Sequence, residues 1–361
     1  MPHAPTHRPA NGTGRQGARL TSVLGGCWVD RTAVRHRAET GPSRYVSEVT
    51  DAALTKLARS DPRRALVIVS GGDAESPFTT PTAACKQGLA AGNTDTALRE
   101  HLLATGYNVY TSPAKEGPGQ IESSPGFGGF SDGPPALPES MTVNAVGDID
   151  TAGEHLASFL GYLQTSVGVE VIDLVGHSMG GLFSRAAIRV LQESGSELVI
   201  RSLTTLGTPW QGAFAADYAA GALDRSASGD DQTIETIMDK FSELAAQHPG
   251  GAGEQVTRGY LDVQGWNDRQ AGVLDGIPVT LIGGDHFTLV DGVPEVWPND
   301  GLVALGSALA EGVSTEVLPA VTRLTFPAVH SIFFADALGL PWEKGLTWNP
   351  AALAAVSSAI N

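Results

Sequence analysis

The sequence predicts an α/β fold in which a mostly parallel central sheet is flanked by helices. Short apolar runs rich in Val, Ile and Leu alternate along the chain with segments of helical length, which is the pattern of βαβ units. The apolar runs are continuous, as expected for strands buried on both faces of a sheet. Because 42% of the 361 residues are hydrophobic, the chain can bury the core of one large domain.

The first cycle of predicted elements precedes a loop rich in Gly and Pro. In order, these elements are a helix over 44–60, a strand over 65–69, a helix over 94–105, a strand over 107–111 and the loop over 116–140. Asp61-Pro62 closes the first helix, and Gly106 caps the second. The strand over 65–69 ends in Ser-Gly-Gly, which is typical of a turn at the end of a buried parallel strand.

The second cycle repeats this alternation over the rest of the chain. Its predicted elements are a helix over 148–166, a strand over 169–175, a helix over 182–193, and strands over 198–206, 278–282 and 322–326. Residues 208–277 show no strand character, and Thr233–Gln247 is amphipathic at helical spacing. We therefore expect 208–277 to form a helical cap or lid insertion over the carboxyl edge of the sheet, with a surface elaboration as the alternative.

Charge and hydropathy exclude several kinds of partner. The net charge of −16 argues against nucleic acid and against an anionic membrane surface. Residues 1–40 have the opposite charge, because they contain six Arg and only two acidic residues, Asp30 and Glu39. We therefore predict a basic, flexible arm over 1–40, followed by one domain over 41–361. No run of about 18 apolar residues is present, so no transmembrane segment is expected.

The cysteines and the N-terminal segment leave the cellular compartment open. Cys27 and Cys85 lack the spacing of metal ligands, and whether they pair is not decided by the sequence. The segment Leu20–Val29 is too short and too often interrupted to be the apolar region of a secretory signal. A cytoplasmic location is therefore the default expectation.

Two Gly-x-Ser-x-Gly patterns occur, and their contexts distinguish them. Ser131 lies in the loop over 116–140, without a strand before it or a helix after it. Ser178 follows an apolar strand and precedes a helix, an arrangement that holds a serine hydroxyl above the sheet in a strained turn. We predict Ser178 as a nucleophile and the N–H of Met179 as an oxyanion donor at the helix N-terminus. His177 is expected to point away from Ser178.

The segment VIDLVGHSMGGLFSRAAI around Ser178 resembles the nucleophile elbow of the α/β-hydrolase superfamily, in particular of its lipase-like members. Leu203–Pro209 resembles the strand and G-T-P turn that follow in those lipases, and Asn299–Val303 resembles their acid-bearing N-D-G-L-V segment. The motifs occur in the family's order and cover about residue 65 to 335. The resemblance implies an α/β-hydrolase fold, a serine esterase or triacylglycerol lipase of lipid metabolism, and secretion.

In this fold the partners of the serine follow in the order acid, then histidine. His330 is the one histidine after Asp300 and follows the predicted strand over 322–326, so we predict it as the base, with a surface histidine as the alternative. Asp300 matches the motif and is the predicted acid. Asp285, directly after the strand over 278–282, is the alternative acid, and His286 is expected at the rim of the pocket.

The second oxyanion donor is expected in the loop after the first core strand. Lipases usually carry His-Gly there, whereas this chain has Ser70-Gly71-Gly72-Asp73. We predict the N–H of Gly72 as the donor, with Gly71 and Asp73 as alternatives. Some lipases with an N-D-G-L-V segment hold calcium through an aspartate two residues after the catalytic histidine, but this chain has Ile332 there. We therefore predict no metal and no cofactor.

Together these residues predict a carboxylic ester hydrolase that forms an acyl-enzyme on Ser178. The substrate is expected to be a small-molecule or lipid ester. Aromatic residues around the insertion favour an apolar acyl or alcohol group, unless they belong to the core; they are Trp210, Tyr218, Trp266, Phe287 and Trp297. The alternatives are a thioesterase, lactonase or acyltransferase with the same triad, and a binding protein without catalysis. Acyl chain length and oligomeric state are left open.

Overall fold

The computed structural model describes residues 57–82, 94–121 and 136–361. Within them, a six-stranded sheet has the order β2-β1-β5-β6-β7-β8, and every neighbouring pair in it is parallel. Its strands are β1 (Arg64–Val69), β2 (Val109–Thr111), β5 (Val171–His177), β6 (Val199–Leu206), β7 (Val279–Gly284) and β8 (Val321–Phe326). A small parallel pair joins β3 (Ala114–Lys115) to β4 (Val143–Asn144). The predicted parallel α/β sheet is confirmed.

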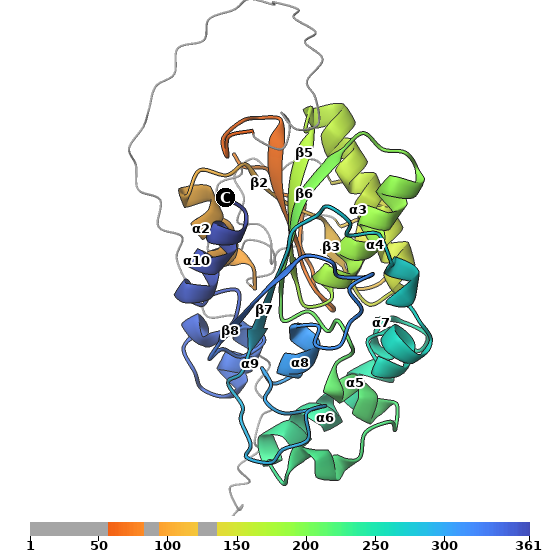
Figure 1. Cartoon of the computed structure of the whole chain (residues 1–361), viewed down its shortest axis with the longest axis vertical. Coiled ribbons are helices and arrows are strands. Elements are labelled where there is room, and N and C mark those ends of the chain that lie inside the picture. Colours follow the sequence, from red (N-terminus) through yellow and green to blue (C-terminus); the bar gives the residue numbers. More distant parts are fainter. Residues whose placement is uncertain (1–56, 83–93, 122–135) are drawn as a thin grey trace, which may run out of the picture.

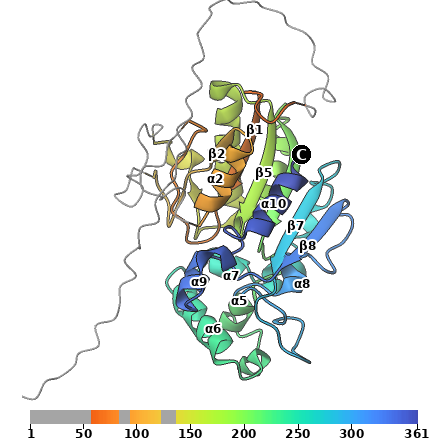
Figure 2. The same cartoon turned by 90° about the vertical axis from the view of Figure 1, so that its left-hand side faces the viewer.

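Helices cover both faces of the sheet, as Figures 1 and 2 show. These helices are α2 (Thr96–Ala104), α3 (Ile149–Tyr162), α4 (Gly180–Glu193) and α10 (Pro350–Ala359). In β1, Val67 and Val69 pack in the core that contains α3 and α4, whereas Leu66 and Ile68 pack in the core that contains α2 and α10. Successive side chains of a strand point to opposite faces, so burial of both faces explains the continuous apolar run.

The strand order reverses between β1 and β5. From β1 the chain moves outward to β2, and it then returns to add β5, β6, β7 and β8 on the other side of β1. Connections therefore leave β1 and β5 in opposite directions, and open α/β sheets bind ligands at the carboxyl end of such a switch point. Ser70 follows β1 and Ser178 follows β5, so both of the loops with predicted functional groups begin at this switch point.

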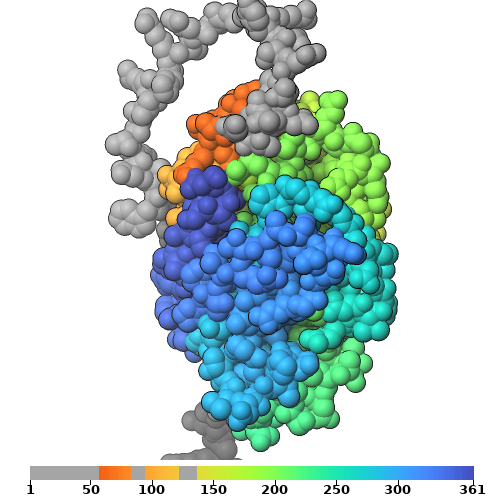
Figure 3. Space-filling view, in the orientation of Figure 1, coloured from red at the N-terminus to blue at the C-terminus, as the bar shows by residue number. Residues whose placement is uncertain are grey.

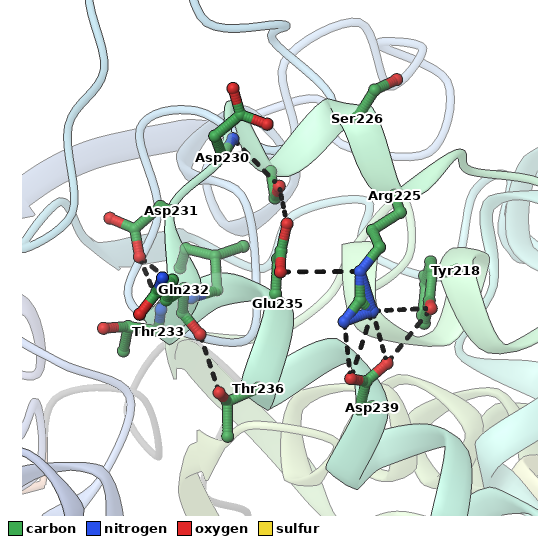
Figure 4. Close-up of polar contacts among 12 residues, drawn as sticks. Tyr218, Arg225, Ser226, Asp230, Asp231, Gln232, Thr233, Glu235, Thr236 and Asp239 are labelled. Carbon is green, nitrogen blue, oxygen red and sulfur yellow. Dashed lines mark hydrogen bonds and ion pairs between the residues drawn. The ribbon is translucent and has the colours of Figure 1, made fainter.

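Residues 208–277, called the insertion below, fold into helices between β6 and β7. They comprise α5 (Phe214–Ala219), a 3-10 helix (Arg225–Ser228), α6 (Gln232–Ala245), α7 (Ala252–Gln255), a π-helical turn (Gly259–Val263) and a second 3-10 helix (Asp268–Gln270). Ile234 and Met238 of α6 pack with Phe214 and Trp297. The part of the insertion around α5 and α6 and the segment after β7 together form one end of the molecule (Figure 3). The carboxylate of Asp231 caps α6 by accepting the N–H groups of residues 233 and 234 (Figure 4).

Several boundaries differ from the predicted ones. Most of the helix predicted over 44–60 lies outside the described residues, and its last residues, 57–60, form a loop and turn. The helix predicted over 148–166 changes at Leu163 into a π-helical turn, which ends at Gly168 with a φ of +85°. The remaining elements are 3-10 helices at Glu139–Met141 and Trp342–Lys344 and the helices α8 (Leu305–Ala308) and α9 (Ile332–Ala337). The basic arm over 1–40, Cys27, Cys85 and Ser131 lie outside the described residues.

Candidate active site

Ser178 lies at the sharp turn between β5 and α4. Its φ is +54°, in the left-handed region that residues other than glycine rarely adopt, and 8% of its surface is exposed. The turn is held from the neighbouring strand: the N–H of Ser178 donates to the carbonyl of Leu206 at 2.8 Å, and the hydroxyl of Thr208 donates to the Ser178 carbonyl at 2.7 Å. These bonds hold the strained backbone that the Gly-x-Ser-x-Gly pattern predicts.

Glycines allow the backbone to close around Ser178. A Cβ on Gly176 would lie 2.5 Å from the amide nitrogen of Gly181, and a Cβ on Gly180 would collide with the carbonyl of Val69. A Cβ on Gly71, in the loop after β1, would lie 2.5 Å from the Cβ of Ser178. A larger residue at position 176 would open the turn at Ser178 itself. One at position 180 or 71 would push this turn away from the end of β1 and the loop that follows it.

His330 and Asp300 form a chain of hydrogen bonds with Ser178. His330 Nε2 lies 3.0 Å from Ser178 Oγ, and His330 Nδ1 lies 2.7 Å from Asp300 Oδ2. Asp300 is fully buried, and its Oδ1 accepts the N–H groups of Leu302 and Val303 at 3.0 and 2.8 Å. With Oδ1 held by these two donors, Oδ2 can accept the Nδ1 proton of His330, which leaves the lone pair of Nε2 facing the serine hydroxyl.

The alternative acid, Asp285, is not part of this series of hydrogen bonds. Asp285 is half-buried just after β7, and its backbone N–H donates to the carbonyl of Phe326 at 3.1 Å. Among the described residues, its side chain makes no hydrogen bond to His330. His286 packs edge-on against Phe287 at 5.0 Å, and burial lowers its pKa. Of the two candidate acids, only Asp300 lies beside the histidine.

His177 supports the main chain of His330. Its Nε2 lies 2.9 Å from the carbonyl oxygen of His330, which can only accept, so Nε2 carries the proton and donates it. Burial, together with the nearby His330, lowers the pKa of His177 to about 3 and keeps the ring neutral. Among the described residues, His177 makes no hydrogen bond to the side chain of Ser178. The bond to the His330 carbonyl joins residues 153 positions apart, so no local pattern could reveal it.

Gly207 is a further residue of the site. Its φ is +58°, and a Cβ there would lie 3.0 Å from both Asp300 Oδ2 and His330 Nδ1. The glycine therefore leaves room for the histidine–aspartate bond. The G-T-P motif was the signal that could have identified this position.

The predicted oxyanion donors differ in whether their backbone N–H groups already donate a hydrogen bond within the protein. Asp73 donates its N–H to the carbonyl of Ala145 at 3.4 Å. Within the described residues, the N–H groups of Gly71, Gly72 and Met179 donate to no protein acceptor. A Cβ on Gly72 would lie 2.9 Å from the sulfur of Met179, so the two loops meet here. This difference favours the glycines over Asp73.

Three of the aromatic residues around the insertion belong to the core. Trp210 and Trp266 are fully buried, and the guanidinium of Arg185 lies 4.3 and 4.8 Å from their ring centroids. Trp297 is also buried, and its indole donates to the carbonyl of Ala227 at 3.0 Å. For these three residues a place in the core accounts for the aromatic side chain. Ile332, at the position of the calcium ligand in some lipases, is buried and offers no ligand atom.

Comparisons with known proteins find local likeness around the nucleophile turn. Residues 138–221 match a family described as "Putative serine esterase (DUF676)". The chain is 32% identical over 95 residues to a triacylglycerol lipase of Pseudarthrobacter phenanthrenivorans and equally to one of Burkholderia plantarii. Each alignment covers 26% of this chain, and they cover 28% and 25% of the two lipases. The chain thus spans about a quarter of the length of these relatives.

Likeness over the whole chain is weaker. The mature form of the Bacillus licheniformis lipase BlEst2 superposes with a TM-score of 0.47 at 15% identity, covering 83% of this chain and 93% of that lipase. The strand order, the strand directions and the turn at Ser178 define an α/β-hydrolase fold. The likeness to serine esterases and triacylglycerol lipases is local to part of this fold.

Proposed function

We propose that this chain is a carboxylic ester hydrolase of the lipase or esterase type, which works through an acyl-enzyme on Ser178. The observation that carries the proposal is the chain of hydrogen bonds from Asp300 through His330 to Ser178, at 2.7 and 3.0 Å, on a strained turn. Nucleophile, base and orienting acid within hydrogen-bond reach of one another are the arrangement that activates a serine.

The proposed reaction has two halves. Ser178 Oγ attacks the acyl carbonyl while His330 Nε2 takes its proton, and His330 then returns the proton to the departing alcohol as the ester C–O bond breaks. Water, activated by His330 in the same way, then releases the acid from Ser178. Asp300 holds the imidazole tautomer, and the N–H groups of Met179 and Gly72 stabilise the oxyanion.

The proposed substrate is an ester with an apolar acyl or alcohol group. Support comes from two aromatic rings near the triad. The ring of Phe334 packs edge-on against His330, with the ring centroids 5.8 Å apart. The ring of Phe287 lies beside Gly301, the residue after Asp300, since a Cβ built there would be 3.3 Å from it. We also propose that the insertion covers the site as a cap or lid. Thioesters and lactones present the same acyl carbonyl, and they remain alternatives to the ester because the triad acts on that carbonyl.

Hydrolysis of p-nitrophenyl esters from acetyl to palmitoyl tests the proposal, together with labelling by a serine-directed fluorophosphonate. Ser178→Ala should abolish both turnover and labelling. Ser131→Ala is the matched control, because it removes the serine of the other Gly-x-Ser-x-Gly pattern, and it should leave both unchanged. A chain that is labelled at Ser178 but cleaves only thioesters or lactones would keep the nucleophile and change the substrate class. A folded chain that is never labelled would be a binding protein.

A further inference from the structure

A buried carboxylate lies behind the loop that carries the predicted oxyanion donors. Asp95 is fully buried at the N-cap position of α2, yet its side chain makes no capping hydrogen bond. An aspartate at this position usually stabilises its own helix by accepting one of the first free backbone N–H groups. Here Asp95 Oδ2 instead accepts a hydrogen bond of 2.6 Å from the hydroxyl of Ser70, the residue between β1 and Gly71.

Few groups in the structure offset the cost of burying the Asp95 carboxylate. Asp95 Oδ1 has no hydrogen-bond partner, and within the described residues Asp95 forms no ion pair. Burial raises the pKa of Asp95 to about 6, although the bond from Ser70 lowers it. A buried polar atom without a partner is destabilising. Among the described residues Asp95 neither caps its helix nor forms an ion pair, so its contact with Ser70 is the interaction left to explain.

Ser70 connects this carboxylate to the nucleophile. The next residue is Gly71, where a Cβ would lie 2.5 Å from the Cβ of Ser178, so the loop has no free space on the side of the nucleophile. The far end of the loop is also tied, because Ser76 donates its N–H to the carbonyl of Ala114 at 2.9 Å. A shift of Ser70 would therefore change where the N–H groups of Gly71 and Gly72 point.

We propose that Asp95 and Ser70 are a pair of positioning residues that fix the loop after β1 so that its glycine N–H groups face the oxyanion formed on Ser178. This inference rests on the proposed function. Neither side chain needs to touch the substrate. Because donors aimed at the oxyanion act in the transition state, loss of the pair should lower kcat and leave KM nearly unchanged.

The test is a double-mutant cycle of Ser70→Ala and Asp95→Ala with the best p-nitrophenyl ester. Misplacing the donors should lower kcat about tenfold in either single variant. The double variant should lose no more than either single one, since both changes break the same bond. Asp95→Asn should restore most of kcat, because its amide oxygen can still accept the Ser70 hydroxyl. The affinity for a boronic acid inhibitor, which forms a tetrahedral adduct on Ser178, should fall in proportion to kcat.

Ser202→Ala is the matched control, because Ser202 donates a buried hydrogen bond of 2.5 Å to Asp173 at the opposite end of the sheet. It should lower stability without changing kcat. If folded Ser70→Ala and Asp95→Ala both keep kcat within about twofold of the parent, or if KM alone changes, the pair does not position the oxyanion donors. Failure of the proposed function is recognised separately, by a parent chain that neither turns over esters nor labels at Ser178.

Discussion

The two ends of the central sheet compensate buried charge in different ways. At the amino end, Asp173 of β5 is fully buried, with Arg64 and Arg201 each at 2.8 Å and the Ser202 hydroxyl at 2.5 Å. Both arginines also donate to the carbonyl of Ile360, beyond α10. At the carboxyl end, Asp95 has the Ser70 hydroxyl and an oxygen without a partner.

The carboxyl end also holds a strained backbone. Ser178 has a φ of +54°, a left-handed conformation that is costly for a residue with a Cβ, and it lies next to His330. Strain and incomplete compensation lower stability, and they persist at positions where the surrounding structure holds them and a function requires them. We infer that the amino end contributes stability, whereas the carboxyl end gives up stability to hold the groups of the proposed active site. The following predictions test this division.

The largest effect is expected for the acid at the carboxyl end. Asp300→Asn should lower kcat about 10⁴-fold, because an amide cannot hold the histidine in the tautomer that accepts the serine proton. Asp285→Asn should stay within about twofold of the parent, since Asp285 makes no bond to His330. Steady-state rates with a p-nitrophenyl ester measure both. Equal losses in the two variants would contradict the assignment of the acid.

The amino end should show the opposite behaviour. Asp173→Ala leaves Arg64 and Arg201 without their carboxylate, and breaking a buried ion pair costs about 3–5 kcal/mol of unfolding free energy. The kcat of the folded fraction should not change, because the cluster lies at the far end of the strands. Urea denaturation and active-site titration with a fluorophosphonate separate the two quantities. A parallel loss of kcat would show that the two ends are coupled.

Gly207→Ala probes the strained side of the comparison directly. A left-handed φ costs a residue with a Cβ about 1–2 kcal/mol. The new methyl group would also press on the bond between His330 and Asp300, and such a displacement should lower kcat about a hundredfold. Gly195→Ala is the control, because Gly195 has a φ of +68° but open space around it. Gly195→Ala should lower the unfolding free energy and leave kcat unchanged. If it lowered kcat as well, backbone strain, and not the contact with His330 and Asp300, would explain the loss of activity in Gly207→Ala.

The sequence predicts the sheet well because its signals are local. Continuous apolar runs at β1 and β5 mark strands buried on both faces, and Ser178 follows such a run directly. The order of motifs along the chain is also readable, which is why Asp300 and His330 could be proposed. The helix α10 was not predicted, because PAALAAVSSA is apolar or small all round. The signal that could have identified it is Asn349-Pro350, since the asparagine caps the helix and proline is favoured at its first position.

What the sequence could not provide are contacts between distant segments. Asp95 looks like an ordinary cap of α2, and only the folded chain brings it to Ser70, 25 residues earlier. Likewise, the choice between Asp285 and Asp300 depends on a distance to His330, since both aspartates follow the same strand. The order of the strands in the sheet brings these groups together, and no single segment of the sequence predicts that order.

His177 gives the carboxyl end a sensitivity to acid. Its pKa is lowered from 6.5 to about 3, chiefly by burial, so between these values the unfolded state binds a proton that the native state does not. Stability should therefore fall as pH falls, by about 1.4 kcal/mol for each pH unit below 6.5. His177→Gln should lose less stability than the parent chain between pH 7 and pH 5, as measured by urea denaturation. Identical slopes in the two proteins would contradict a neutral His177.

The smallest effect is expected in the insertion, where an arginine–carboxylate cluster lies in contact with water. Arg225 Nη2 lies 2.7 Å from Asp239, its Nε lies 3.6 Å from Glu235, and the Tyr218 hydroxyl donates to Asp239 at 3.1 Å (Figure 4). The arginine and Asp239 side chains are 43% and 47% exposed, against 5% and 0% for Arg64 and Asp173. Both clusters are held by arginine–carboxylate pairs, but one is exposed and the other is buried.

Exposed pairs contribute less than about 1 kcal/mol and weaken as salt screens them. Arg225→Ala should therefore lower the unfolding free energy by less than about 1 kcal/mol, and this loss should shrink at about 1 M salt. The larger loss in Asp173→Ala should persist there, because salt does not reach the buried cluster. Urea denaturation of both variants at low and high salt makes the comparison. If Arg225→Ala proved as costly and as insensitive to salt as Asp173→Ala, burial would not be what separates the two regions.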